Sequence, residues 1–164
     1  MQYQPLTDKK VKQLFMRFGA IWLQKWTSAF PTSAALTIAK AEWSEGLSGI
    51  SDKSILRGIT TVRQTLEWPP SIAEFRRLCL GLPDKQTVRF RVLQGGGDPL
   101  TNMIREMIGD WELRSKPIDW ISNQAEKFYP IALQEMSDVV IKEQSPAIMS
   151  ENEHLARDNF EAKK

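Results

Sequence analysis

The chain has one cysteine and one histidine among its 164 residues, and both shortages exclude classes of site. A single cysteine cannot form an internal disulfide, which agrees with a reducing compartment. With His154 as the only imidazole, the chain can build neither a His-paired nucleophile nor a multi-histidine metal site. Cys79 shares the apolar side of a helical pattern with Ile72 and Phe75, so we expect packing rather than thiol chemistry. We therefore predict no enzyme activity and no cofactor.

Long hydrophobic runs are also missing. No apolar stretch approaches the ~20 residues needed to cross a bilayer, and residues 1–8 lack the pattern of a secretory signal. We expect a cytoplasmic protein with no membrane partner. The run from Gly46 to Ser54 resembles a phosphate-binding loop only superficially, because Asp52 stands where that pattern requires a glycine and would repel phosphate.

The composition that is present is that of a folded protein. Hydrophobic residues make up 41% of the chain and six are tryptophans, which is more than a disordered chain carries. The net charge of +2 hides an asymmetry: residues 1–94 hold 14 Lys and Arg against 7 Asp and Glu, whereas residues 95–164 hold 8 against 13. A basic front and an acidic back suggest different partners for the two halves, although ordinary solvated faces would give the same counts.

Apolar residues recur at spacings of three and four, which is typical of one face of a helix. Six such segments occur, within residues 11–29, 36–47, 55–66, 72–79, 100–111 and 121–139. Thr7, Ser51, Ser71 and Asp98 stand where helix N-caps are expected. Residues 88–92 alternate like a strand, but no second strand pairs with them, so a short helix or an extended connection is predicted. Pro130 lies inside the sixth segment and predicts a kink or a division into two helices.

The aromatic residues of the first segment could serve either as core or as stacking platforms for nucleobases. Phe15, Phe18, Trp22 and Trp26 repeat at helical spacing, which favours core.

The stretch from Trp68 to Cys79 organises the pattern. Pro69 and Pro70 have no backbone N–H to donate, so an upstream helix must end before them, and Ser71 with Glu74 forms a capping box that opens the next helix. We assign structural roles to this corner and to the aromatic residue of the second segment, namely Trp43, Trp68, Pro69, Pro70, Ser71, Glu74, Phe75 and Cys79.

The predicted fold is therefore all-α, with about six helices in an irregular bundle. Residues 1–94 are expected to form a basic helical domain, and residues 95–143 a C-terminal helical pair that follows a hinge at Gly95, Gly96 and Gly97. Residues 144–164 are polar and charged and are expected to form a flexible tail.

The order of these features resembles the phage replication protein P family. The matching residues are Phe30-Pro31, Trp43, Gly49-Ile50, Ile55, Gly58, Arg63, Pro70-Ser71, Glu74-Phe75, Leu78-Cys79 and Gly81-Leu82-Pro83. A fainter match continues through Asp98-Pro99, Glu112-Leu113-Arg114, Pro117, Phe128 and Leu133. The likeness covers roughly residues 11–140.

The resemblance implies a helicase loader, which captures a replicative DNA helicase, holds its ring open and delivers it to an origin-binding initiator without using a nucleotide. It implies that the C-terminal half faces the helicase, for which we expect contacts from Met103, Met107, Trp111, Phe128 and Tyr129. It implies that the basic half meets the initiator or DNA, including single-stranded DNA. The expected contacts there are Arg57, Arg63, Arg76, Arg77, Arg89 and Arg91.

Two other functions remain open from the sequence. A helical DNA-binding regulator would use the same arginines near the corner, which has some likeness to a helix-turn-helix. An effector or interaction protein of a mobile element could use the same helical scaffold.

Overall fold

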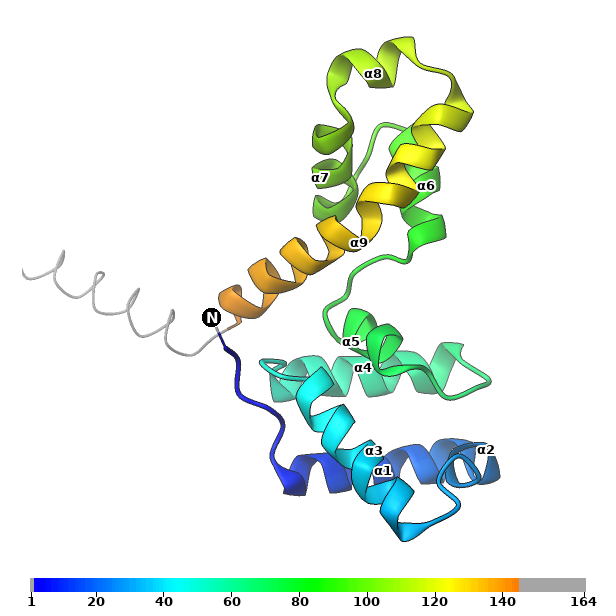
Figure 1. The fold of residues 1–164 in the computed structure, drawn as a ribbon, viewed down its shortest axis with the longest axis vertical. Coiled ribbons are helices and arrows are strands. Elements are labelled where there is room, and N and C mark those ends of the chain that lie inside the picture. Colours follow the sequence, from blue (N-terminus) through cyan, green and yellow to red (C-terminus); the bar gives the residue numbers. More distant parts are fainter. Residues whose placement is uncertain (1, 145–164) are drawn as a thin grey trace, which may run out of the picture. The chain divides into compact units, whose positions relative to one another are not determined.

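The computed structural model describes residues 2–144, and this part of the chain contains helices and no strand. The all-α prediction is confirmed. The helices are α1 (Asp8–Trp22), α2 (Gln24–Thr27), α3 (Ser33–Gly46), α4 (Asp52–Thr65), α5 (Ile72–Cys79), α6 (Lys85–Leu93), α7 (Pro99–Ile108), α8 (Asp110–Ser115) and α9 (Ile118–Glu143) (Figure 1). The predicted tail lies outside the described residues except for Gln144.

The predicted number of about six helices is too low, because three short helices were not separated or not assigned. Leu23 has a φ of 52°, a value that interrupts the first helical segment and splits off α2. The alternating residues 88–92 are helical, with Val88 and Val92 one turn apart and both buried in α6. Gly109, with a φ of 99°, separates α8 from α7. In contrast, α9 continues through Pro130 as one helix.

The helix starts follow the predicted capping residues. The side chains of Thr7, Ser51, Ser71 and Asp98 each accept a hydrogen bond from a backbone N–H in the first turn of the following helix. Such a cap satisfies an N–H group that has no partner within the helix. These starts were readable from the sequence because capping is a local interaction.

The described residues form two compact units: unit 1 consists of residues 2–80 and 143–144, and unit 2 of residues 81–142. The first division, between Leu80 and Gly81, comes earlier in the chain than the one expected between residues 94 and 95. The predicted hinge is instead a tight turn inside the second unit. Gly95, Gly96 and Gly97 all have positive φ, and the Gly96 N–H donates to the Arg91 carbonyl. The observed boundary precedes the expected one because Val88 and Val92 of α6 pack against Leu100 and Ile104 of α7, so α6 belongs to the second unit.

Unit 1 is built around an aromatic cluster from α1, α2, α3 and α5. Phe18 is fully buried, and its ring centroid lies 5.0–5.5 Å from those of Trp22, Trp26, Trp43 and Phe75, in edge-on arrangements. The prediction of core rather than base-stacking aromatics is therefore confirmed for these rings. In this unit α1 packs on α3, and α5 packs along α4 (Figure 1).

The α4–α5 contact depends on Gly58. A Cβ atom at this position would lie 2.3 Å from Cys79 Sγ and 3.1 Å from Phe75 Cε2. Cys79 is buried, and this burial raises the pKa of its thiol to about 12. The thiol is therefore a packing group in the folded protein, as expected from its position.

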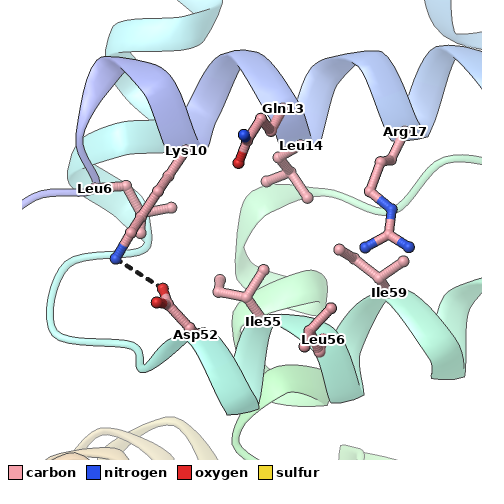
Figure 2. Close-up of a pocket in the computed structure, with 9 residues that line it drawn as sticks. All are labelled: Leu6, Lys10, Gln13, Leu14, Arg17, Asp52, Ile55, Leu56 and Ile59. Atoms are coloured by element: carbon pink, nitrogen blue, oxygen red, sulfur yellow. Dashed lines mark ion pairs between the residues drawn. The ribbon is translucent and has the colours of Figure 1, made fainter.

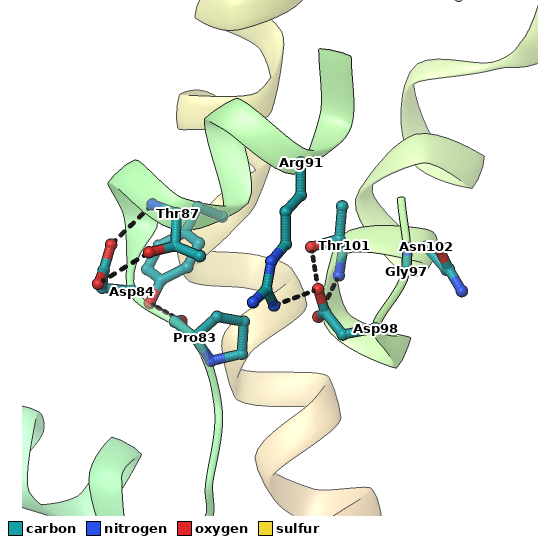
Figure 3. Close-up of polar contacts among 9 residues, drawn as sticks. Pro83, Asp84, Thr87, Arg91, Gly97, Asp98, Thr101 and Asn102 are labelled. Atoms are coloured by element: carbon teal, nitrogen blue, oxygen red, sulfur yellow. Dashed lines mark hydrogen bonds and ion pairs between the residues drawn. The ribbon is translucent and has the colours of Figure 1, made fainter. Parts of the chain in front are cut away.

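Unit 2 has a separate core in which α6 and α7 pack against α9. The turn between α6 and α7 is fixed by Asp98, whose carboxylate accepts hydrogen bonds from the Thr101 N–H, the Thr101 hydroxyl and Arg91 Nη1 (Figure 3). The Gly97 N–H donates to Asn102 Oδ1 beside this network. Partial burial opposes ionisation of Asp98, but the hydrogen bonds from Thr101 and the Arg91 guanidinium outweigh it and hold the carboxyl pKa below its ordinary value.

We expect Asp98→Ala to lower the free energy of unfolding of unit 2 by about 1–2 kcal/mol at neutral pH, because it removes a helix cap and an ion pair. Since the pKa of Asp98 is depressed on folding, its contribution is present above the unfolded-state pKa and is lost as pH falls through the folded-state pKa. Urea denaturation followed by circular dichroism would show the difference from wild type shrinking on acidification. Asp110→Ala, at a carboxylate that is almost fully exposed, is the matched control and should change stability little.

Candidate docking groove between α1 and α4

A depression with an apolar lining runs between α1 and α4 in unit 1. It has a volume of about 230 Å³ and an apolar lining from Leu6, Leu14, Ile55, Leu56 and Ile59, with Lys10, Gln13, Arg17 and Asp52 at its edges (Figure 2). Leu14 and Ile59 are buried and form the floor, whereas Leu56 is 54% exposed. An exposed leucine beside an apolar floor makes this depression suitable for an apolar side chain of a partner.

The two helices that flank the groove run in the same direction. Lys10 Nζ lies 2.7 Å from Asp52 Oδ1 near their N-terminal ends, and Trp22 Nε1 donates to the Leu66 carbonyl near their C-terminal ends. The lining of the groove extends from Lys10 to Arg17 on α1 and from Asp52 to Ile59 on α4. This is about seven residues along each helix, which corresponds to a length of roughly 10 Å. A groove of this length accommodates about two turns of another helix.

Arg17 is the charged group that lacks a partner in the groove. Its side chain extends from α1 toward Ile59 of α4 (Figure 2). Lys10 is paired with Asp52, but Arg17 makes no ion pair or side-chain hydrogen bond within residues 2–144. A guanidinium beside an apolar floor is a ready binding group for a carboxylate, because it can donate two parallel hydrogen bonds.

The six arginines predicted to contact DNA or an initiator do not form one patch within either unit. Arg57, Arg63, Arg76 and Arg77 belong to unit 1, and Arg89 and Arg91 belong to unit 2. Arg76 Nη1 donates to the carbonyls of Gly46 and Ser48, and Arg91 pairs with Asp98, so both stabilise the fold. Arg57 donates to Ser54 Oγ, Arg77 is half-buried, and Arg89 lies 3.9 Å from Glu126.

The predicted helicase contacts are mostly part of the unit 2 core. Met103, Met107 and Phe128 pack against that core, and Tyr129 is buried, with its hydroxyl donating to the Pro83 carbonyl. Only Trp111 of this set is exposed, at 65%, with Lys116 Nζ 5.6 Å from its ring centroid. The apolar spacing that suggested a contact surface is therefore a core face for most of these residues.

The structural residues of the corner divide in a similar way. Trp43, Phe75 and Cys79 are buried, and Ser71 caps α5. Trp68, which was also assigned a structural role, is 65% exposed, and Lys25 Nζ lies 4.3 Å from its ring centroid. The two prolines turn the chain here and leave the indole at the surface.

Sequence reasoning missed the α1–α4 groove. Leu14, Ile55 and Ile59 were recognisable as apolar helix positions, but their periodicity does not show whether another helix covers them. The exposed Leu56 next to them was the available indication.

Two kinds of site are absent from the part of the chain that the structure describes. Within residues 2–144, no group of three His, Cys, Asp or Glu side chains could hold a metal ion. None of the helices described there is both long and apolar enough to cross a membrane. Comparison with protein-family models, with curated proteins and with solved structures found no match for this chain.

Proposed function

We propose that the chain is a non-catalytic DNA-replication adaptor, which binds a replicative helicase and loads it at the origin of a phage or other mobile element. The observation that carries the proposal is the corner at residues 70–79 and its distance from the tryptophan-containing helix, which resemble the replication protein P family. Three of the matching residues, Gly58, Phe75 and Cys79, lie together at the contact between α4 and α5.

The proposed mechanism is differential binding. An adaptor that contacts only the open form of a ring-shaped helicase shifts the helicase population toward that form, and no bond needs to be broken by the adaptor. The exposed Trp111 supports this role, because a large exposed aromatic side chain is a frequent energetic centre of protein interfaces. It lies in the half that the family resemblance assigns to the helicase.

The test is co-elution of the full chain with the replicative helicase of its host on a sizing column, with and without ATP. We expect a complex, and we expect Trp111→Ala to weaken it by about tenfold or more. Trp68→Ala is the matched control, since Trp68 is the same residue type with the same exposed fraction and lies in unit 1. Absence of a complex under both nucleotide conditions would refute the helicase proposal.

A DNA-binding regulator is the second candidate, and it is favoured by the exposure of Arg57 and Arg63 on α4. This function predicts an affinity for DNA that falls steeply with salt concentration and is reduced by Arg63→Gln. Salt-dependent DNA binding without helicase binding would favour this candidate over the adaptor.

A further inference from the structure

We propose that the α1–α4 groove is a docking site for an acidic amphipathic helix of a partner protein. This site goes beyond the proposed helicase contact, because it lies in unit 1 and does not include Trp111. The proposal rests on three properties of the groove: its apolar floor, its length and its charge.

The apolar lining determines that the occupant has an apolar face. Leu14 and Ile59 form a floor, and Leu56 stands exposed beside it. Helix-in-groove recognition places apolar anchors of the partner at positions i, i+3 or i+4, and i+7. Two turns of helix along a groove of roughly 10 Å supply such a set of anchors, since positions i and i+7 lie about 10.5 Å apart.

The charges around the groove determine that the occupant is acidic. The charged residues that line the groove are Lys10, Arg17 and Asp52, and Asp52 is already paired with Lys10, which leaves one net positive charge at Arg17. Arg17 points into the groove without a partner among the described residues. A partner carboxylate next to its apolar anchors would pair with Arg17 where the apolar surroundings reduce screening by water.

The parallel direction of α1 and α4 also favours one orientation of the partner. Their N-terminal ends lie at the Lys10–Asp52 end of the groove, so the positive ends of both helix dipoles are there. A partner helix that runs antiparallel to both would place its negative C-terminal end at this position.

The experiment is selection of a display library of helical peptides, each of about 15 residues, on the immobilised full chain. We expect enrichment of peptides with apolar residues spaced by three and four and with Asp or Glu beside them. The dissociation constants of the selected peptides would then be measured by fluorescence anisotropy for wild type and variants. Failure to enrich any peptide, or enrichment of neutral or basic peptides, would overturn the proposal.

Two pairs of variants separate the groove from the general surface. Leu56→Glu should weaken peptide binding by about tenfold or more, whereas Ile38→Glu, at an isoleucine of α3 that is 64% exposed, should leave it within about twofold. Arg17→Glu should also weaken binding by about tenfold, whereas Lys12→Glu reverses a charge on the side of α1 that faces α3 and should have little effect. Equal losses within either pair would contradict docking in the groove.

The remaining outcomes distinguish this site from the helicase contact and from self-association. Trp111→Ala should leave peptide binding unchanged even if it abolishes the helicase complex, so each proposal can fail without the other. Sedimentation of the purified wild-type chain should not reveal a dimer that is lost in the Leu56→Glu variant. Such a dimer would make a second copy the occupant and would overturn the proposed acidic partner.

Discussion

Phe18→Ala is expected to lower the free energy of unfolding of unit 1 by about 3–5 kcal/mol, the largest effect of any single substitution considered for this protein. Phe18 is fully buried, and four aromatic rings surround it at centroid distances of 5.0–5.5 Å. Truncation removes the buried area of the ring, leaves a cavity and deletes four edge-on aromatic contacts. A domain of this size is stable by roughly 5–15 kcal/mol, so the variant would lose a large fraction of its stability.

Guanidinium denaturation followed by tryptophan fluorescence measures this loss, because Trp22, Trp26 and Trp43 lie in the same cluster. Phe90→Ala is the matched control, because it also truncates a phenylalanine to alanine. Phe90 is 62% exposed, so its truncation should cost less than about 0.5 kcal/mol. Similar midpoints for Phe18→Ala and Phe90→Ala would show that the aromatic cluster does not hold unit 1 together.

Gly58→Ala should destabilise unit 1 by about 2 kcal/mol, although the same change in an unhindered helix would stabilise it by roughly 0.5–1 kcal/mol. The added methyl group would lie 2.3 Å from Cys79 Sγ, a buried atom on a short side chain that has little freedom to move. Helices α4 and α5 would have to separate, or the Phe75 ring would have to shift, to relieve the clash. The steric cost therefore exceeds the gain in helix propensity.

Gly19→Ala provides the opposite case in the same unit. Its new methyl group would meet nothing closer than Trp26 Cδ1 at 3.9 Å, so this variant should be slightly more stable than wild type. Cys79→Ala should recover part of the loss in the Gly58→Ala background, since it removes the clashing sulfur atom, and a double-mutant cycle measures that coupling. If Gly58→Ala stabilises the protein as Gly19→Ala does, then α4 and α5 do not pack closely at Gly58.

Several local features of the fold could be predicted from sequence because their causes lie within a few residues. Thr7, Ser51, Ser71 and Asp98 cap helices through bonds to residues three positions later, and this spacing is visible in the chain itself. The proline pair at the corner was also readable, since a residue without an N–H interrupts a helix wherever it occurs.

Features that depend on contacts between distant residues were predicted less well. The glycine run at residues 95–97 was interpreted as a hinge, but Arg91, Asp98 and Asn102 fix it as a turn between helices that share one core. Tyr129 was assigned to a binding surface, but it is buried and bonded to the Pro83 carbonyl. A helical pattern shows which residues share a face, but it does not show what covers that face.

The sequence by itself determined that this protein is helical, where most of its longer helices begin, and that its first-segment aromatics form a core, because helix propensity, capping and apolar periodicity are local properties. Only the tertiary structure decided the division at Leu80, the close approach at Gly58 and the open groove beside Arg17. These depend on which helices pack together, and such packing is decided by side chains far apart in the chain.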